Sequence, residues 1–122
     1  VLRVFAAIRK PLPKDVVGPK EWSIFTLLKA EADDFEKPLI QVTQILWPDK
    51  SEFLRQDIPF KFGEKPHHQN RVNITGFPIG QTGDLEVKTW VERDSQRISE
   101  IHSWYIEIQH KVESVADEAT KP

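Results

Sequence analysis

The paired histidines His67 and His68, followed by Gln69 and Asn70, are the residues best suited to hold a metal ion. Neutral imidazoles bind zinc, nickel and copper. Adjacent residues on an extended chain point to opposite sides, so a site here would need ligands from elsewhere. We predict that residues 63–70 form a solvated polar loop, and that the chain has no resident metal or other cofactor.

Glu100 and His102 offer a second combination, because residues two apart share one face of a strand. A carboxylate in that position can orient an imidazole for general-base catalysis. The sequence shows no nucleophile in a strained turn and no oxyanion-stabilising arrangement. His110 lies eight residues beyond His102. On one strand that is roughly 26 Å, too far to share a metal. We therefore predict a polar pair and no enzymatic activity.

Trp90 is the residue best placed to contact a partner. It lies in a predicted strand, residues 85–91, in which Leu85, Val87 and Val91 make one apolar face. The opposite face carries the candidate binding residues Trp90, Glu86, Lys88 and Glu92. An indole among charges is either covered by a loop or available to a protein or a sugar ring, and tryptophan is enriched at interface hot spots.

Trp104 and Trp47 are predicted to fill the core instead. Trp104 shares a strand face with Ile106 and Ile108, while Glu107 takes the other face. The glycine-containing stretch 80–84 is predicted to be a turn. It is not a phosphate-binding loop, because no Lys-Ser or Lys-Thr follows it and no helix begins there.

Length and composition limit what the chain can be. Its 122 residues fit one domain, and the formal net charge of -2 argues against a nucleic-acid or membrane-surface partner. The absence of cysteine excludes disulfides and thiolate chemistry, and favours a reducing compartment such as the cytoplasm. No apolar run is long enough to span a bilayer. Because the chain starts at Val1 and has no methionine, the sequence leaves a preceding targeting segment open.

Frequent turn residues and apolar alternation favour strands over helices. We expect strands at residues 2–9, 22–30, 39–47, 58–62, 71–77, 85–91 and 98–110. Residues 51–56 form a short strand or one helical turn, and 22–35 could instead be a short helix. Gly18 and Pro19 are predicted to break the chain, and Pro59 to mark an edge strand. The predicted fold is one all-β domain over 1–112, followed by a flexible tail, 113–122.

A resemblance gives this fold a more specific form. Residues 72–108 resemble the last third of an immunoglobulin-like sandwich, with a strand, a glycine-containing corner at 83–87, a strand, a hairpin and a long final strand, but without that family's two hallmark residues at the corner. Leu85 and Val87 stand where that family has its corner tyrosine and its disulfide cysteine. A wider pattern, in 22–25, Phe35, Pro38, 72–74 and 83–85, is similar to uncharacterised bacterial and phage immunoglobulin-like proteins. The resemblance implies an antiparallel immunoglobulin-like β-sandwich of seven or eight strands, and no activity.

The sequence thus predicts a non-catalytic structural or protein-interaction module. Its contact surfaces would be exposed strand edges and the face that carries Trp90, and its partner a protein, including a second copy of itself. The alternative is a sandwich that binds carbohydrate or another small ligand, with an exposed tryptophan as the stacking platform.

Overall fold

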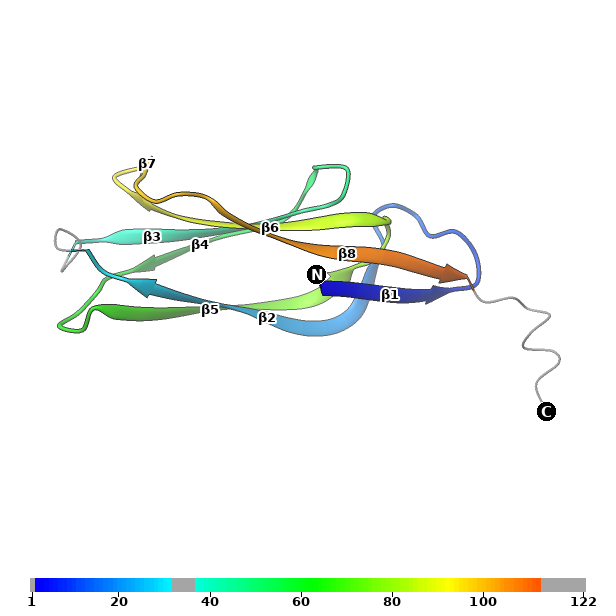
Figure 1. Ribbon diagram of the computed structural model, residues 1–122, viewed down its shortest axis with the longest axis horizontal. Helices are drawn as coiled ribbons and strands as arrows, with labels where there is room; N and C mark the ends of the chain where they lie inside the picture. The colour runs from blue at the N-terminus through cyan, green and yellow to red at the C-terminus, as the bar shows by residue number, and fades with distance from the viewer. Residues whose placement is uncertain (1, 32–36, 113–122) are drawn as a thin grey trace.

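The computed structural model describes residues 2–31 and 37–112, and every regular element in them is a β-strand (Figure 1). The strands are β1 Leu2–Ile8, β2 Val17–Lys29, β3 Leu39–Leu46, β4 Glu52–Phe60, β5 His67–Pro78, β6 Gly83–Arg93, β7 Gln96–Arg97 and β8 His102–Val112. The all-β prediction is confirmed, and residues 22–29 are strand rather than helix. The predicted tail, 113–122, lies outside the described residues.

The strands form two open sheets. The larger sheet has the order β1-β8-β6-β3-β4, with the short β7 pairing to the end of β6, and the smaller sheet consists of β2 and β5. Every pair is antiparallel except β1 and β8, which run parallel from Leu2 opposite Ile106 to Ile8 opposite Val112. The purely antiparallel arrangement predicted from sequence is therefore wrong for β1.

Apolar residues of both sheets meet in one main cluster. Its buried members are Ile45, Val72, Ile74, Phe77, Leu85, Val87, Ile106 and Ile108. Except for Phe77, those that share a strand lie at alternate positions, as expected when one face of each strand is buried. Trp47, just past the end of β3, is also buried, which confirms its predicted place in the core.

Polar side chains are buried between the sheets as well. The Asn70 amide donates to Gln41 Oε1 at 2.6 Å, and the Gln41 amide donates to Thr89 Oγ1 at 3.1 Å. The Thr89 hydroxyl in turn donates to the Val42 carbonyl at 3.0 Å. These bonds link β5 to β3 and β6, and they satisfy groups that would otherwise be costly to bury.

The predicted loops and breaks differ from the structure at three places. Residues 67–70 are not a loop, because β5 starts at His67 and pairs with β2 along its full length. Gly18 and Pro19 do not end a segment but lie at an irregularity within β2. Residues 51–56 and 58–62 are mostly joined in the single strand β4. This strand ends the larger sheet, which confirms the edge position predicted for Pro59.

Candidate interaction site

A hollow of about 310 Å³ wraps around the free edge of β2. The lining residues are Phe25, Thr26, Leu27 and Leu28 of β2, Thr89, Trp90 and Val91 of β6, Ser99, and His102 and Trp104 of β8. Inward-facing and outward-facing residues of β2 both line it, so the hollow extends past the strand into the space where a neighbouring strand would lie. We call this region the open flank.

Trp104 faces the interior yet is exposed. It lies opposite Val87 in the β6–β8 ladder and shares its strand face with the buried Ile106 and Ile108. Val87 is only 3% exposed, but Trp104 is 48% exposed. The predicted strand face of Trp104 is therefore right, and its predicted burial is wrong.

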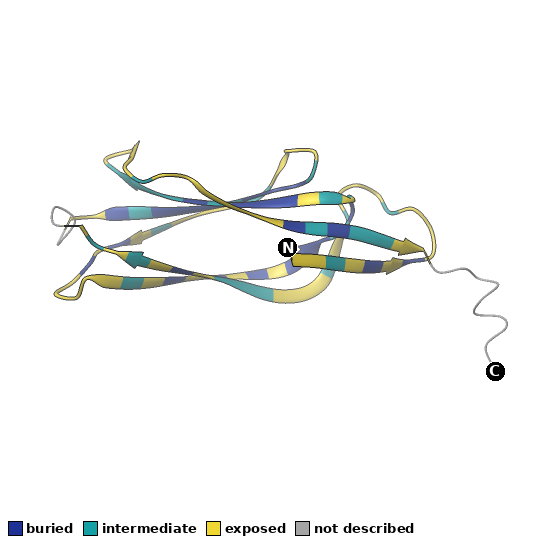
Figure 2. Ribbon diagram, viewed as in Figure 1, coloured by how far each residue is buried: buried dark blue, intermediate teal, exposed yellow. Residues whose placement is uncertain are grey.

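The cause is the difference in width between the two sheets. Among residues 2–31 and 37–112, the smaller sheet has two strands and ends at β2, so no described strand of it covers the first residues of β8. In the larger sheet, the described part of β1 pairs with β8 from Leu2 opposite Ile106 onward, and no described residue pairs with 102–105 on that side. Figure 2 shows β8 exposed at its start, buried or intermediate in its middle and exposed again at its end.

Large apolar side chains surround the open flank. Phe25 and Leu27 project from the outward face of β2 and are 57% and 72% exposed. Ile98 is exposed too, and it lines a neighbouring hollow together with Leu28 and His102. Contiguous exposed apolar surface of this kind is typical of interaction sites, whereas single exposed residues are ordinary.

The open flank also contains a polar group with unused hydrogen-bonding capacity. The Thr26 hydroxyl is buried, and it has no hydrogen-bond partner among the described residues. His102 lies on the same hollow and is exposed. The predicted pairing of His102 with Glu100 does not occur as a hydrogen bond between these two residues, because Glu100 precedes the strand rather than lying on its face.

The predicted binding face of β6 lies on the outer side of the larger sheet and is more covered than the sequence suggested. Trp90 is half-buried and outside both apolar clusters, and it is also one of the residues that line the hollow of the open flank. Its Nε1 donates to Glu92 Oε2 at 2.8 Å. The Arg55 guanidinium lies over its ring, 5.7 Å from the centroid. Lys88 and Glu92 are half-buried as well.

Glu86 departs furthest from the open, charged face expected there, since it is 6% exposed. Lys50 Nζ lies 3.4 Å from its carboxylate, and the Tyr105 hydroxyl donates to it at 3.2 Å. Burial by itself would raise the pKa of Glu86, but Lys50, Lys88 and Tyr105 together hold that pKa below its usual value. Glu86 therefore stabilises the outer face rather than presenting a free charge.

The histidine pair does not form a metal site with its neighbours. His68 stacks on Phe60, with centroids 4.8 Å apart, and its Nε2 lies 2.8 Å from Asn70 Oδ1. His67 is exposed on the other face of β5. Within 2–31 and 37–112, no group of three or more His, Asp or Glu side chains is arranged to hold a metal ion.

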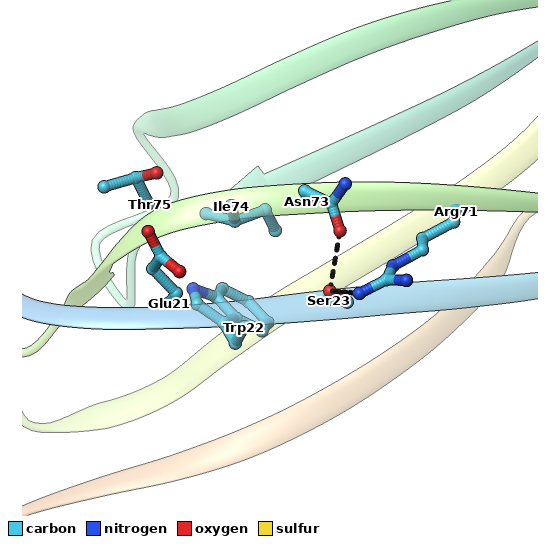
Figure 3. A pocket seen from close by; sticks show the side chains of 7 residues that line it. All are labelled: Glu21, Trp22, Ser23, Arg71, Asn73, Ile74 and Thr75. Carbon is cyan, nitrogen blue, oxygen red and sulfur yellow. Dashed lines mark hydrogen bonds between the residues drawn. The ribbon is translucent and has the colours of Figure 1, made fainter.

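A second hollow, of about 450 Å³, lies over the outward face of the smaller sheet (Figure 3). Ser23 Oγ donates to Asn73 Oδ1 at 2.9 Å, and Arg71 donates to Ser23 Oγ at 3.4 Å. The Arg71 guanidinium also lies over the Phe25 ring, 5.1 Å from its centroid. These polar groups bind one another, so the open flank is the better candidate site.

Comparison with known proteins adds no relative. No protein-family model matches the chain, and neither a curated protein nor a solved structure matches it. In the described part of the chain there is no helix that could cross a membrane.

Sequence reasoning missed Phe25 and Leu27 as site residues, although a signal was present. Residues 22–28 carry apolar side chains on both faces of the strand, whereas a strand that covers a core on one side usually alternates with polar residues. The apolar residues on the second face of β2, Phe25 and Leu27, could therefore have been chosen as candidate contact residues from the sequence.

Proposed function

We propose that this chain is a non-catalytic protein-interaction module with an immunoglobulin-like fold, and that it contacts its partner at the open flank. The strand order supports the fold. In immunoglobulin variable domains, the last two strands join the third strand and a further edge strand in one sheet, and the second strand lies in the other. Here β8, β6, β3 and β4 follow that order, with β2 and β5 opposite.

The exposure of Trp104 is the observation that carries the proposed contact. A tryptophan on the inward face of a strand is normally covered by the opposite sheet, and at Trp104 that cover is missing. Covering its indole, together with Phe25 and Leu27, would remove apolar surface from water at about 25 cal/mol per Å². Trp104 lines the same hollow as Phe25 and Leu27, and tryptophan is enriched at interface hot spots.

A photo-crosslinking comparison tests this proposal. The photoreactive amino acid benzoylphenylalanine replaces Trp104 in one variant and Phe5 in a control variant, both expressed in the native cell. Phe5 lies on β1, is 62% exposed and does not line the hollow. We expect a discrete protein adduct from position 104 and none from position 5. Adducts from position 5 alone would move the contact to the edge strand β1. The absence of adducts from both positions would contradict an interaction role.

A carbohydrate ligand is the second candidate, and the Thr26 hydroxyl favours it. This buried hydroxyl lacks a partner among the described residues and lies on the same hollow as Trp104 and His102. An indole that stacks on a sugar ring beside a free hydroxyl and an imidazole is a suitable arrangement for a pyranose. Binding of soluble oligosaccharides that is lost in Trp104→Ala, with no protein adduct at position 104, would favour this alternative.

A further inference from the structure

We propose that the open flank binds an extended segment of another protein, which adds to the free edge of β2 as a further antiparallel strand. This inference rests on the proposed interaction function and states the chemistry of the partner. In strand addition, main-chain hydrogen bonds supply affinity and the alternate side chains supply specificity. The backbone of β2, the hollow beside it and the charges at its ends each support this mode of binding.

The backbone of β2 offers hydrogen-bonding groups along its free edge. Ala30 N donates to the Pro66 carbonyl at 2.7 Å, and these two residues continue the register in which Lys29 lies opposite His67. Directly opposed residues of an antiparallel ladder alternate between bonded and non-bonded pairs. Counting back from Ala30, the even-numbered residues of 24–28 bond to β5, and the odd-numbered residues between them direct their N–H and C=O groups outward. Among the described residues, no strand pairs with that edge.

The edge of β2 lacks the devices that normally prevent strand pairing. Natural edge strands are protected by charged residues, proline or bulges. The free strand β4 carries Arg55, Asp57 and Pro59. In β2, the irregularity and the charges lie toward the ends, and residues 22–28 contain neither a charge nor a proline. This stretch is therefore open to pairing with another chain.

The hollow specifies the inner face of the added strand. Cross-strand neighbours point to the same side of a sheet, so residues opposite Thr26 and Leu28 would enter the hollow that Trp104 lines. Side chains with apolar surface at these positions would cover the indole. The Thr26 hydroxyl is buried and has no hydrogen-bond partner among the described residues. A serine or threonine opposite it would supply that partner, as cross-strand hydroxyl pairs do.

The outer face and the ends of β2 specify the rest of the segment. Phe25 and Leu27 project outward and are exposed, so apolar residues opposite them are favoured. Glu21 and Lys29 lie on the same outward face, before and after the uncharged stretch. An antiparallel segment that complements these charges starts with an acidic residue opposite Lys29 and ends with a basic residue opposite Glu21. The partner is thus an apolar strand with one hydroxyl residue inside and opposite charges at its two ends.

A synthetic peptide of this design gives the first test. In acetyl-EVVTVVTTK-amide, the glutamate would lie opposite Lys29, the first threonine opposite Thr26 and the lysine opposite Glu21. The control peptide acetyl-KVVTVVTTE-amide exchanges the two charged ends, so like charges would oppose each other. We expect the first peptide to bind the full chain with a Kd of about 10–500 µM. The control should bind at least about threefold more weakly, and equal binding would overturn the proposed antiparallel direction.

Amide hydrogen exchange shows whether the peptide adds as a strand. In the free chain, the amides of Phe25 and Leu27 face solvent and should exchange quickly. The Thr26 amide is bonded to β5 and should exchange slowly. At a peptide concentration of about ten times its Kd, exchange at Phe25 and Leu27 should slow about tenfold, because only the unbound chain then exchanges freely. Exchange at Thr26 should change little.

A proline substitution removes one of the proposed main-chain donors. Leu27→Pro deletes an N–H that faces the free edge and leaves the bonds to β5 in place, and edge strands tolerate proline at such positions. Leu27→Ala is the matched control, because it also loses the leucine side chain but keeps the N–H. The proline variant should bind the peptide at least about fivefold more weakly than the alanine variant.

Thr26→Val is a second variant, which keeps the shape of the side chain and leaves every backbone bond of β2 available. It removes the hydroxyl that the peptide's threonine is proposed to meet. We expect it to bind acetyl-EVVTVVTTK-amide about two- to tenfold more weakly than the parent. Unchanged affinity would show that the hydroxyl plays no part in recognition and would overturn the proposed inner face.

The outcomes separate this inference from the proposed function. Slow exchange at Phe25 and Leu27 in the free chain would overturn it, because the chain itself or a second copy would then occupy the edge. So would the absence of binding at about 1 mM peptide, binding that leaves both amides in fast exchange, or equal affinities for Leu27→Pro and Leu27→Ala. In the last three cases, a discrete protein adduct from position 104 would still support an interaction module, whose partner docks through side-chain contacts alone.

Discussion

The Asn70 side chain donates a 2.6 Å hydrogen bond to Gln41, and this bond joins the two sheets through a buried contact. Gln41 is fully buried and also donates to Thr89. A buried amide with its partners in place fixes how the sheets meet, whereas an amide left without a partner is destabilising.

Gln41→Leu should therefore destabilise the fold although leucine has a similar volume. The Asn70 amide would lose its acceptor in a buried position, which costs about 1–3 kcal/mol. The control is Ser23→Ala, which removes an exposed hydrogen bond to Asn73 and should change stability by no more than about 0.5 kcal/mol. Urea melts of the two variants give the comparison, and equal losses would show that the buried network has no special role.

Much of the fold was predictable from local pattern. The alternation of apolar residues in 85–91 and 71–77 gave the correct inward faces, including Leu85, Val87 and Val72. Pro59 marked an edge because proline cannot donate a ladder hydrogen bond. These features depend on neighbours in sequence. The parallel pairing of β1 with β8 depends on residues about a hundred positions apart, and no local signal specifies it.

The candidate site was predicted less well for the same reason. Alternation fixed which side of β8 carries Trp104, but not whether another strand covers that side. Coverage depends on the width of the opposite sheet, which ends at β2. At Trp90 the error runs the other way. Alternation in β6 predicts an exposed side chain there, but Arg55 of β4 lies over the Trp90 ring and partly covers it.

Trp104→Ala should cost little stability in the monomer, despite the size of the side chain. About half of its surface is already in water, so the substitution leaves a shallower hollow rather than a closed cavity. Ile108→Ala, on the same strand face but 1% exposed, should cost about 2–5 kcal/mol. Denaturation at low protein concentration, where a dimer would dissociate, gives the measurement. A larger loss for Trp104→Ala than for Ile108→Ala would mean that the tryptophan is a core residue after all.

The two neighbouring histidines should respond differently to substitution. His68→Ala removes a ring stacked on Phe60, and such aromatic pairs contribute about 0.5–1.5 kcal/mol. His67→Ala removes an exposed ring and should be within about 0.5 kcal/mol of the parent. Added zinc should leave the melting temperature of the parent unchanged. A rise in melting temperature with zinc that His67→Ala abolishes would restore the metal site that the structure argues against.

Acid should destabilise the fold partly through Glu86, whose pKa in the folded protein is held below its ordinary value of 4.5. Burial of the carboxyl opposes this shift, while Lys50 and Tyr105 produce it. A carboxyl with a lowered pKa contributes its full stabilisation above the unfolded value. That contribution is lost as pH falls through 4.5 toward the folded pKa. In Glu86→Gln this part of the acid dependence should disappear, so the variant is less stable than the parent at pH 7 and closer to it at low pH. Urea melts across this range test the sign, and a gap that stays constant or widens on acidification would show that the pKa of Glu86 is not lowered in the folded protein.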